Sequence, residues 1–292
     1  MSLQITYSLM THPGLLRSSN EDVLEAGTIL KPDSGGNPTK IHYVIACDGM
    51  GGMKAGETAS HLTCNSVVSY LQSLPFWPGV EEDVCHVLQD AVMAAHQSIL
   101  LLSDADFDKS GMGSTLALLL IHNKSAYVLW IGDSRIYLLS KRNEIVGLKQ
   151  EGLDLLTKDH SINWNLVESG VLTLDQIRNA PGGHVLTQSI GSQSHPVSET
   201  RILKLIDGDR FLICTDGVNL HIDTKEMYQI LQGYTDKNTA IQKMQDVILF
   251  KGAKDNFSIG IVDVMDVQVK EPVLTKSTKS TISTKKPKIT KV

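Results

Sequence analysis

The sequence predicts an α+β fold in which helices lie outside and two β-sheets lie inside. Helix-like segments occur in two pairs, with many strand-like segments around them, and such elements pack as layers. Several strand candidates are apolar throughout, as in 43–46 and 126–131, which is typical of strands covered on both faces. The strand candidates are 3–9, 41–47, 114–121, 125–131, 135–140, 200–206, 210–215 and 257–264.

The first helix pair is predicted at 55–74 and 81–103. In the second of these helices, apolar residues recur at helical spacing and form one stripe, as in a helix that packs one face on a core. Acidic residues at 81–83 suit the positive end of a helix dipole. The stripe residues are Val84, Val87, Leu88, Ala91, Val92, Ala95, Ile99 and Leu102.

The second helix pair is predicted in the C-terminal third of the chain. One helix begins with a capping box formed by Asp223 and Glu226. The other begins after Asp236 and ends near Gly252. These two segments are the pair that we expect to cover the second sheet.

A further helix is expected at 161–180, outside both pairs. Its apolar residues have helical spacing, and Thr173 with Gln176 forms another capping box. We therefore expect helical structure over most of this segment.

Composition places the chain among soluble globular proteins. It has 292 residues, of which 41% are apolar and 20% charged. No apolar run approaches the roughly 18 residues that a membrane-spanning helix needs, and the first residues do not resemble a signal peptide. We expect a cytoplasmic protein without a membrane span. Its cysteines show no metal-binding or redox spacing, so we expect reduced and mostly buried thiols at Cys47, Cys64, Cys85 and Cys214.

Charge divides the chain into an acidic body and a basic tail. The formal net charge is −5, but residues 271–292 carry six Lys and one Glu, so residues 1–270 sum to −10. An acidic body argues against nucleic-acid binding, which needs clustered basic residues. We expect one domain at 1–267 and a disordered Ser/Thr/Lys-rich tail at 268–292. The tail is predicted to be solvated; contact with an acidic partner or membrane surface, or phosphorylation, is the alternative.

Acidic residues follow or precede several predicted strands, often next to glycine. A single Asp-Gly most often marks a turn, but the joint occurrence of so many makes independent turns an improbable account. Strand ends that are far apart in sequence can meet at one rim of a sheet, where active sites are common. The residues in question are Glu21, Asp22, Asp48, Asp133, Asp216 and Asp255.

A cluster of these carboxylates favours hard divalent cations. Carboxylate and carbonyl oxygens suit Mg²⁺ or Mn²⁺, whereas zinc prefers Cys and His. Several carboxylates in one place would repel one another strongly without cations. The sequence therefore predicts a site for two or more Mg²⁺ or Mn²⁺ ions.

Other chemistries find no support in the sequence. The glycine-rich stretch 49–52 matches neither phosphate-binding loop motif, and Lys54 occupies the last glycine position of the dinucleotide motif. There is no zinc-protease motif and no G-x-S-x-G, and Cys47 lies inside a predicted buried strand. Of the ten histidines, His160 has the most suggestive context, and we expect it to form structural hydrogen bonds rather than to bind a ligand.

An ordered set of motifs resembles the metal-dependent type 2C (PPM family) serine/threonine protein phosphatases in their compact bacterial form. The resemblance extends from about residue 5 to 265, and the tail lies outside it. It implies a four-layer α-β-β-α sandwich with two central, mainly antiparallel sheets flanked by helix pairs. The matching segments are 17–22, 48–52, 113–115, 132–135, 159–160, 186–191, 215–217 and 255–258.

The resemblance also implies roles for individual metal ligands. Asp48 would bridge two ions, and Gly49 would bind through its carbonyl. Asp133 and Asp216 would share a weaker third ion, while Glu21 and Asp22 would act directly or through water. The matching metal positions are Asp48, Gly49, Asp216, Asp255, Asp22, Glu21 and Asp133.

Substrate binding is implied by the same resemblance. Arg17 matches the arginine that holds the substrate phosphate, so Asp48, Asp216 and Arg17 are the expected catalytic residues. Some relatives have a histidine, proposed as general acid, where this chain has Met50, so the leaving oxygen must take its proton from another group. Segment 145–185 matches the flap of relatives and is expected to shape access to the site.

The function implied is hydrolysis of phosphoserine and phosphothreonine in proteins by a metal-activated water, without a covalent intermediate. Phosphorylated proteins and a cognate Ser/Thr kinase are the expected partners of a monomeric enzyme. The first alternative is a pseudophosphatase, which would bind phosphoproteins without turnover. A metal-dependent nucleotidyl enzyme is a second alternative, but it would need a nucleotide-holding loop that the sequence lacks.

Overall fold

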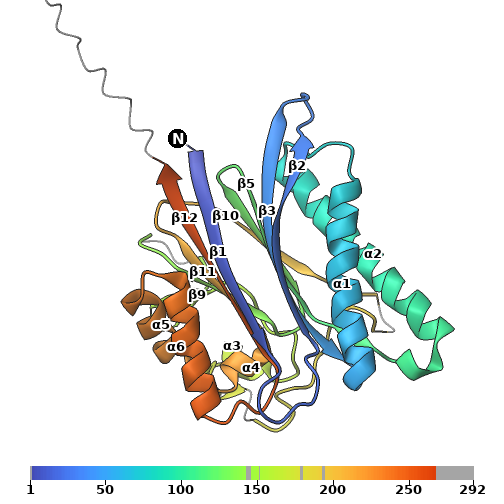
Figure 1. The fold of residues 1–292 in the computed structure, drawn as a ribbon, viewed down its shortest axis with the longest axis vertical. Helices are drawn as coiled ribbons and strands as arrows, with labels where there is room; N and C mark the ends of the chain where they lie inside the picture. The colour runs from blue at the N-terminus through green and yellow to red at the C-terminus, as the bar shows by residue number, and fades with distance from the viewer. Residues whose placement is uncertain (1, 143–145, 151, 178–179, 193–194, 268–292) are drawn as a thin grey trace, which may run out of the picture.

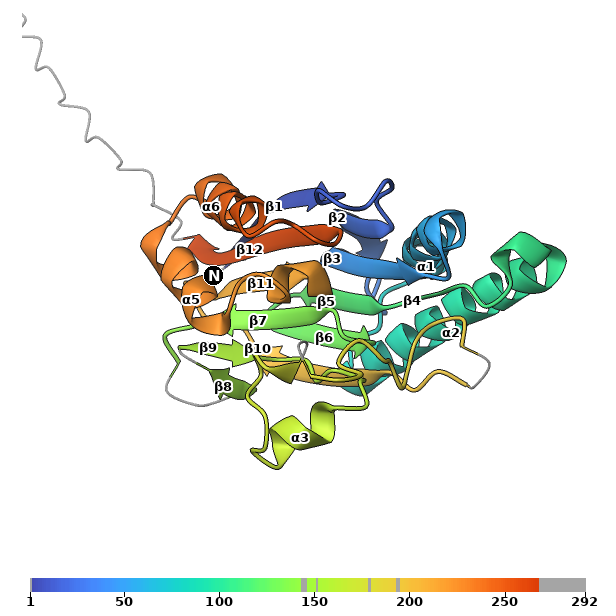
Figure 2. The ribbon, with the colours of Figure 1, turned by 90° about the horizontal axis from the view of Figure 1, so that it is seen from below.

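The protein is a four-layer α-β-β-α sandwich (Figures 1 and 2). The computed structural model describes residues 2–142, 146–150, 152–177, 180–192 and 195–267. Two six-stranded sheets face each other, and one pair of long helices covers the outer face of each sheet. The predicted fold class is confirmed, including the antiparallel pairing of neighbouring strands.

The first sheet contains the two ends of the described chain. Its strands run in the order β1-β12-β11-β7-β9-β8, and β1 pairs with β12 along its whole length. Because Ser2 lies opposite Val267, both ends of the domain are at the same end of the sandwich (Figure 1). Its strands are β1 (Ser2–His12), β7 (Arg135–Leu139), β8 (Leu148–Gln150), β9 (Leu153–Leu155), β11 (Arg210–Cys214) and β12 (Phe257–Val267).

The second sheet has the order β10-β6-β5-β3-β2, with the short strand β4 beside β3. Its longest strand, β3, runs from one end of the sandwich to the other and places Asp48 next to Asp22 of β2. Its strands are β2 (Asp22–Pro32), β3 (Pro38–Met50), β4 (Gly113–Ser114), β5 (Leu116–His122), β6 (Ser125–Ile131) and β10 (Glu199–Lys204).

The helices cover the outer faces as the sequence predicts. The first pair packs on the second sheet and the other pair on the first sheet. The predicted N-caps of the second pair are present, because Asp223 accepts a hydrogen bond from the Glu226 N–H at 2.7 Å and Asp236 from the Thr239 N–H at 2.8 Å. The helices are α1 (Met53–Ser73), α2 (Glu81–Ala105), α3 (Trp164–Glu168), α4 (Asp216–Asn219), α5 (Thr224–Gly233) and α6 (Lys237–Phe250), with a 3₁₀ turn at Phe107–Lys109.

Three apolar cores hold the four layers together, one in each space between neighbouring layers. Strand β3 shows why its sequence is apolar on both faces. Ile41, Tyr43 and Ile45 belong to the core under α1 and α2, whereas Val44 and Ala46 belong to the core between the sheets. Each face of the strand is therefore buried against a different layer.

The prediction of a helix at 161–180 is wrong for most of that segment. Within the described part of this segment the only α-helix is α3, Trp164–Glu168. The chain then reverses at Gly170, whose φ of +74° is accessible to glycine and not to a continuing helix. The Thr173 N–H does donate to Gln176 Oε1 at 2.9 Å, but this hydrogen bond closes a turn.

Three strands were not among the predicted ones. Strand β2 lies at the edge of its sheet, and β8 and β9 extend the edge of the other. Because β8 and β9 fall within 145–185, that part of the predicted flap belongs to the sandwich itself.

Strand β12 ends at Val267, the last described residue, and the predicted tail at 268–292 lies outside the described residues, so the predicted boundary stays a prediction. None of the described helices combines the length and the apolar character needed to cross a bilayer. The four cysteines are free thiols, three buried and Cys85 partly buried, as predicted.

Candidate active site

A cleft of about 740 Å³ opens at one end of the sandwich, where strands of both sheets end. Five carboxylates line it, and Arg17 is the only Lys or Arg among its described lining residues. The cleft is therefore strongly acidic. Its lining comprises Arg17, Glu21, Asp48, Gly49, Met50, Gly51, Gly52, Thr115, Asp133, His184, Leu186, Ser189, Asp216, Leu220, Asp255 and Asn256.

Asp48 lies where β3 leaves its sheet and enters the cleft. The Asp48 N–H donates to the Thr115 hydroxyl at 2.9 Å, and the Thr115 N–H donates to the Asp48 carbonyl at 2.9 Å. The next residue, Gly49, lies so close to α1 that a side chain there would collide with the Gly56 carbonyl. Glycine is needed at 49 for this close approach, and the backbone beside Asp48 is held firmly.

Asp216 and Asp255 enter the cleft from the neighbouring strands β11 and β12. Asp216 begins α4 directly after β11, and Asp255 stands just before β12. The Ser258 N–H donates to the Thr215 hydroxyl at 2.9 Å, and the Thr215 N–H donates to the Ser258 carbonyl at 3.3 Å. These bonds join the two strand ends and fix the backbones that carry both carboxylates.

Asp22 lies beneath these strand ends and not in the cleft lining. Its carboxylate accepts hydrogen bonds from the hydroxyls of Thr215 at 2.6 Å and Ser258 at 2.8 Å, and only 5% of its surface is exposed. Burial raises the pKa of Asp22 to about 7; the hydrogen bond from Thr215 opposes this rise and the charge of Asp216 adds to it. Asp22 thus ties β2 to the two strands that carry Asp216 and Asp255.

Arg17 and Glu21 come from the loop between β1 and β2. Arg17 Nη2 donates to Asp255 Oδ2 at 2.9 Å, and the Arg17 side chain is 52% exposed. The Glu21 N–H donates to Asn256 Oδ1 at 2.9 Å, and the Glu21 carbonyl accepts from the Gly49 N–H at 3.2 Å. Burial raises the pKa of the Glu21 carboxyl, Arg17 lowers it and Asp255 raises it further. The loop is thus bound to both walls of the cleft.

Asp133 is buried in the turn between β6 and β7. The Gly132 N–H donates to His160 Nδ1 at 3.2 Å, and the His160 N–H donates to the Gly132 carbonyl at 2.9 Å. Directly after the turn, Arg135 forms a buried two-point ion pair with Asp159, with N–O distances of 2.8 and 2.7 Å. His160 therefore supports the turn through hydrogen bonds, as predicted for it, and does not line the cleft.

The structure brings all the predicted site residues together at one cleft, with Asp22 behind its wall. Sequence reasoning missed the roles of Thr115 and Asn256, although both lie in quoted motifs: Thr115 fixes the Asp48 backbone, and Asn256 Nδ2 donates to carbonyls of the β1–β2 loop. It also missed His184, for which the sequence holds no signal. Among the described residues of 145–185, His184 alone lines the cleft.

The cleft suits a divalent cation by the chemistry of its donors. As the side chains stand, no three Asp, Glu, His or Cys residues in the described part of the chain are grouped to hold one ion. The potential ligands that line the cleft are nevertheless mainly oxygens, with five carboxylates, one histidine and no cysteine, and oxygen ligands are the ones that Mg²⁺ and Mn²⁺ prefer. Neighbouring carboxylates also raise the pKa of Asp22 and Glu21, so added positive charge would be favourable.

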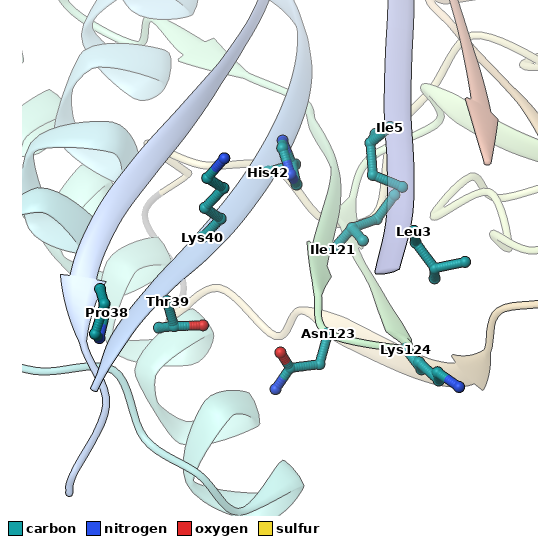
Figure 3. Close-up of a pocket in the computed structure, with 9 residues that line it drawn as sticks. All are labelled: Leu3, Ile5, Pro38, Thr39, Lys40, His42, Ile121, Asn123 and Lys124. Carbon is teal, nitrogen blue, oxygen red and sulfur yellow. The ribbon is translucent and has the colours of Figure 1, made fainter. Parts of the chain in front are cut away.

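A second cavity of about 480 Å³ lies between the sheets at the opposite end of the sandwich (Figure 3). Leu3 and Ile5 of β1 face Ile121 of β5 across it. The described residues that line it include Lys40 and Lys124 but no Asp or Glu. This cavity therefore has the opposite charge to the cleft.

Comparison with known proteins places the whole domain in one family. The family model for protein phosphatase 2C matches residues 36–249. A putative protein phosphatase 2C-type of Streptococcus pyogenes is 31% identical over 256 residues, which cover 87% of this chain and 96% of that protein. The serine/threonine phosphatase stp of Listeria innocua is 28% identical over 257 residues, which cover 87% of this chain and 93% of that protein.

Solved structures agree with these matches. The serine/threonine phosphatase of S. agalactiae has a TM-score of 0.73 at 25% identity and covers 90% of this chain and 100% of its own. The catalytic domain of the phosphatase PstP, solved with two manganese ions, has a TM-score of 0.73 at 26% identity, covering 91% of this chain and 100% of that domain. The fold, the acidic cleft and these matches agree, and the chain belongs to the protein phosphatase 2C family.

Proposed function

We propose that this protein removes phosphate from phosphoserine and phosphothreonine in other proteins, by metal-dependent hydrolysis without a covalent intermediate. The observation that carries the proposal is the convergence of five carboxylates from both sheets on one cleft, with Arg17 as its only described Lys or Arg. Relatives named above include the serine/threonine phosphatase stp, and the catalytic domain of the serine/threonine phosphatase PstP was solved with two manganese ions. Phosphate chemistry and divalent cations fit the same acidic cleft.

The metal site would be built from residues of four chain segments. Asp48, the Gly49 carbonyl, Asp216 and Asp255 are the proposed ligands of two Mg²⁺ or Mn²⁺ ions, and Asp133 with Asp216 those of a weaker third. Glu21 completes the lining, and Asp22 acts from behind it. Bound there, such ions supply Lewis-acid stabilisation of phosphate charge and a water activated at neutral pH.

The protein's own groups orient the reaction. The Asp48 backbone is fixed by two hydrogen bonds to Thr115, and Asp216 and Asp255 stand on strand ends joined through Thr215 and Ser258. These hydrogen bonds fix the backbones, so any rearrangement on ion binding is confined to the carboxylate side chains. Asp22 is a positioning residue, because its carboxylate ties the same strand ends together.

Arg17 is the proposed phosphate ligand. Its guanidinium bonds a carboxylate oxygen of Asp255 in this structure and is half exposed. A guanidinium binds phosphate oxygens with the same paired N–H groups that it uses to bind carboxylate oxygens. Arg17 can therefore exchange the Asp255 carboxylate for the substrate phosphate. There it would hold the phosphoryl group and stabilise charge on its equatorial oxygens.

A covalent route through cysteine is disfavoured. Cys47, directly before Asp48, is fully buried, and burial raises the pKa of its thiol well above its usual value. The thiolate is the nucleophilic form of cysteine, so the Cys47 thiol is not reactive. Attack by water remains the route that the cleft supports.

The decisive experiment measures phosphate release from a phosphoserine peptide by metal-stripped protein as Mn²⁺ or Mg²⁺ is added. Release should depend on the cation, and Asp216→Asn should lower it by about a thousandfold or more, with an unchanged circular-dichroism spectrum. Lys124→Gln in the opposite cavity is the matched control and should retain full turnover. Peptide binding without phosphate release would support the pseudophosphatase alternative, and release that is independent of metal would contradict the mechanism.

A further inference from the structure

His184 enters the cleft from a turn whose backbone is fixed by its own hydrogen bonds. The Gly183 N–H donates to the Ala180 carbonyl at 2.9 Å, and the Val185 N–H donates to the Gly182 carbonyl at 2.9 Å. Gly182 has a φ of +77°, a left-handed conformation that glycine adopts without strain. These bonds close two successive turns, so the backbone at His184 has a defined course.

A neighbouring segment holds this turn against the sandwich. The Ile162 N–H donates to the Val185 carbonyl at 3.1 Å, and the Thr187 N–H donates to the His160 carbonyl at 2.7 Å. His160 also supports the turn that carries Asp133, through the hydrogen bonds described above. The wall of the cleft behind the exposed imidazole is therefore attached to the side that carries Asp133.

Arg17 belongs to a different wall of the same cleft. The loop between β1 and β2 is bonded to the segment that carries Asp255, because the Asn256 side-chain amide donates to two carbonyls of that loop, both at 2.8 Å. Arg17 and His184 nevertheless line one cleft of about 740 Å³. A phosphoryl group held by Arg17 would therefore occupy the space that both walls enclose.

The reaction needs a proton on the side of the cleft away from the carboxylates. An in-line displacement places the attacking and the leaving oxygen on opposite sides of phosphorus. In the proposed function the attacking water lies at the strand ends that carry the carboxylates, so the leaving oxygen points away from those strand ends. A serine or threonine oxygen is strongly basic when it leaves, and a positioned acid lowers the barrier to its departure.

His184 is the residue of the lining best suited to donate this proton. Among the described lining residues it is the only histidine, and Arg17 is the only Lys or Arg. Histidine readily gains and loses a proton near neutral pH, whereas a guanidinium keeps its proton. Met50, in the same lining, has no proton to give.

We infer that His184 is the general acid of the reaction and donates a ring N–H proton to the serine or threonine oxygen that leaves phosphorus. The inference rests on the proposed function and adds a catalytic residue to it. As the water oxygen bonds to phosphorus, the P–O bond to the side chain breaks and its electron pair passes to the leaving oxygen, which takes the proton. The attacking water loses a proton to solvent, and the neutral imidazole regains one from solvent. The products are the free hydroxyl side chain and inorganic phosphate.

The test compares three substrates whose leaving oxygens differ in basicity: p-nitrophenyl phosphate, phenyl phosphate and a phosphoserine peptide, each with Mn²⁺. Nitrophenolate leaves readily as an anion, phenolate less readily, and the serine oxygen needs a proton most. In His184→Gln, kcat should fall about 100-fold or more for the peptide, about tenfold for phenyl phosphate and less than about twofold for p-nitrophenyl phosphate. The two aryl phosphates are similar in size, so a difference between them reports proton donation and not a lost contact.

His61→Gln is the matched control, because His61 is exposed on α1 and does not line the cleft. It should leave all three rates unchanged. Equal losses with the two aryl phosphates, or no loss with the peptide, would overturn the inference. The wild-type protein decides the proposed function separately. Mn²⁺-dependent release of phosphate from the peptide supports that function whatever His184→Gln does, and no release from any of the three substrates overturns the function and the inference with it.

Discussion

The two ends of the sandwich differ in charge although strand β3 contributes to both. This strand contributes Pro38, Thr39, Lys40 and His42 to the far cavity and Asp48, Gly49 and Met50 to the cleft. Among described lining residues, the cleft has five carboxylates and one Arg, whereas the far cavity has two Lys and no carboxylate. Two facing sheets thus offer a hollow at each end, and the residues at the strand ends decide which hollow suits a cation.

Both ends of the sandwich contain a buried ion pair, and the far end also contains an exposed one. At the cleft, buried charged groups join the strands, as in the Arg135–Asp159 pair, whose side chains are only 1% and 2% exposed. At the far end, the side chains of the Arg142–Asp209 pair are only 6% and 0% exposed, whereas the neighbouring pair between Lys204 and Glu81 is solvent-exposed, at 70% and 43%. Buried pairs are costly to break and exposed pairs contribute little, so the comparison makes a quantitative prediction.

The largest effect is expected from breaking the buried Arg135–Asp159 pair and the exposed Lys204–Glu81 pair in turn. Asp159→Ala should lower the free energy of unfolding by about 3–5 kcal/mol, because it leaves the Arg135 guanidinium buried without its carboxylate. Glu81→Ala should cost at most about 1 kcal/mol. Urea unfolding of the metal-free proteins measures both values. Similar losses in the two variants would show that burial does not decide how much an ion pair contributes in this protein.

Cation binding should distinguish the ends next. Mn²⁺ at about 100 times its Kd should raise the free energy of unfolding by about 2.7 kcal/mol, because it binds the folded cleft and not the unfolded chain. Asp48→Asn should abolish most of this gain, whereas Lys124→Gln should keep it. Thermal and urea unfolding with and without Mn²⁺ provide the measurement. A full gain in Asp48→Asn would place the ions elsewhere.

The smallest effect tests whether the ends influence each other through charge alone. Asp48 lies eight residues beyond Lys40 on β3, roughly 26 Å at about 3.3 Å per residue. The Debye length is about 8 Å at 0.15 M salt, so Lys40→Glu should leave Mn²⁺ affinity unchanged there. At about 0.01 M salt, where the Debye length is about 30 Å, Lys40→Glu should raise the Mn²⁺ affinity by about 1.5-fold. Calorimetric titration with Mn²⁺ at both salt concentrations measures these affinities. A clear change in affinity at 0.15 M salt would mean that the fold couples the two ends.

Much of this architecture could be predicted because local patterns agree with the packing. The continuous apolar run in β3 is explained by two different cores, one on each face of the strand. The Asp223 and Asp236 caps form because each needs only its own helix. Acidic residues at strand ends predicted a common rim, since antiparallel strands of both sheets end there.

Other features depend on contacts that no local pattern reveals. Strand β2 contains Glu25, Gly27 and Thr28 among its apolar residues, so it shows no clean alternation, and its place as an edge strand follows from pairing with β3. Asp22 could be assigned to the site, but its burial depends on hydroxyls 193 and 236 residues away. Helical spacing at 161–180 was misleading because Gly170 takes a left-handed conformation.

The pairing of β1 with β12 has a consequence for how the protein is made. Strand β12 lies between β1 and β11, so the first eleven-residue strand finds its sheet neighbour only when the last described strand exists. Asp255 and Asn256, which complete the cleft and clamp its loop, stand at the entrance to that same strand. Contacts so distant in sequence form late and slow folding. A ribosome-bound chain therefore lacks a finished catalytic pocket until translation has passed residue 267, which delays activity until the domain can close.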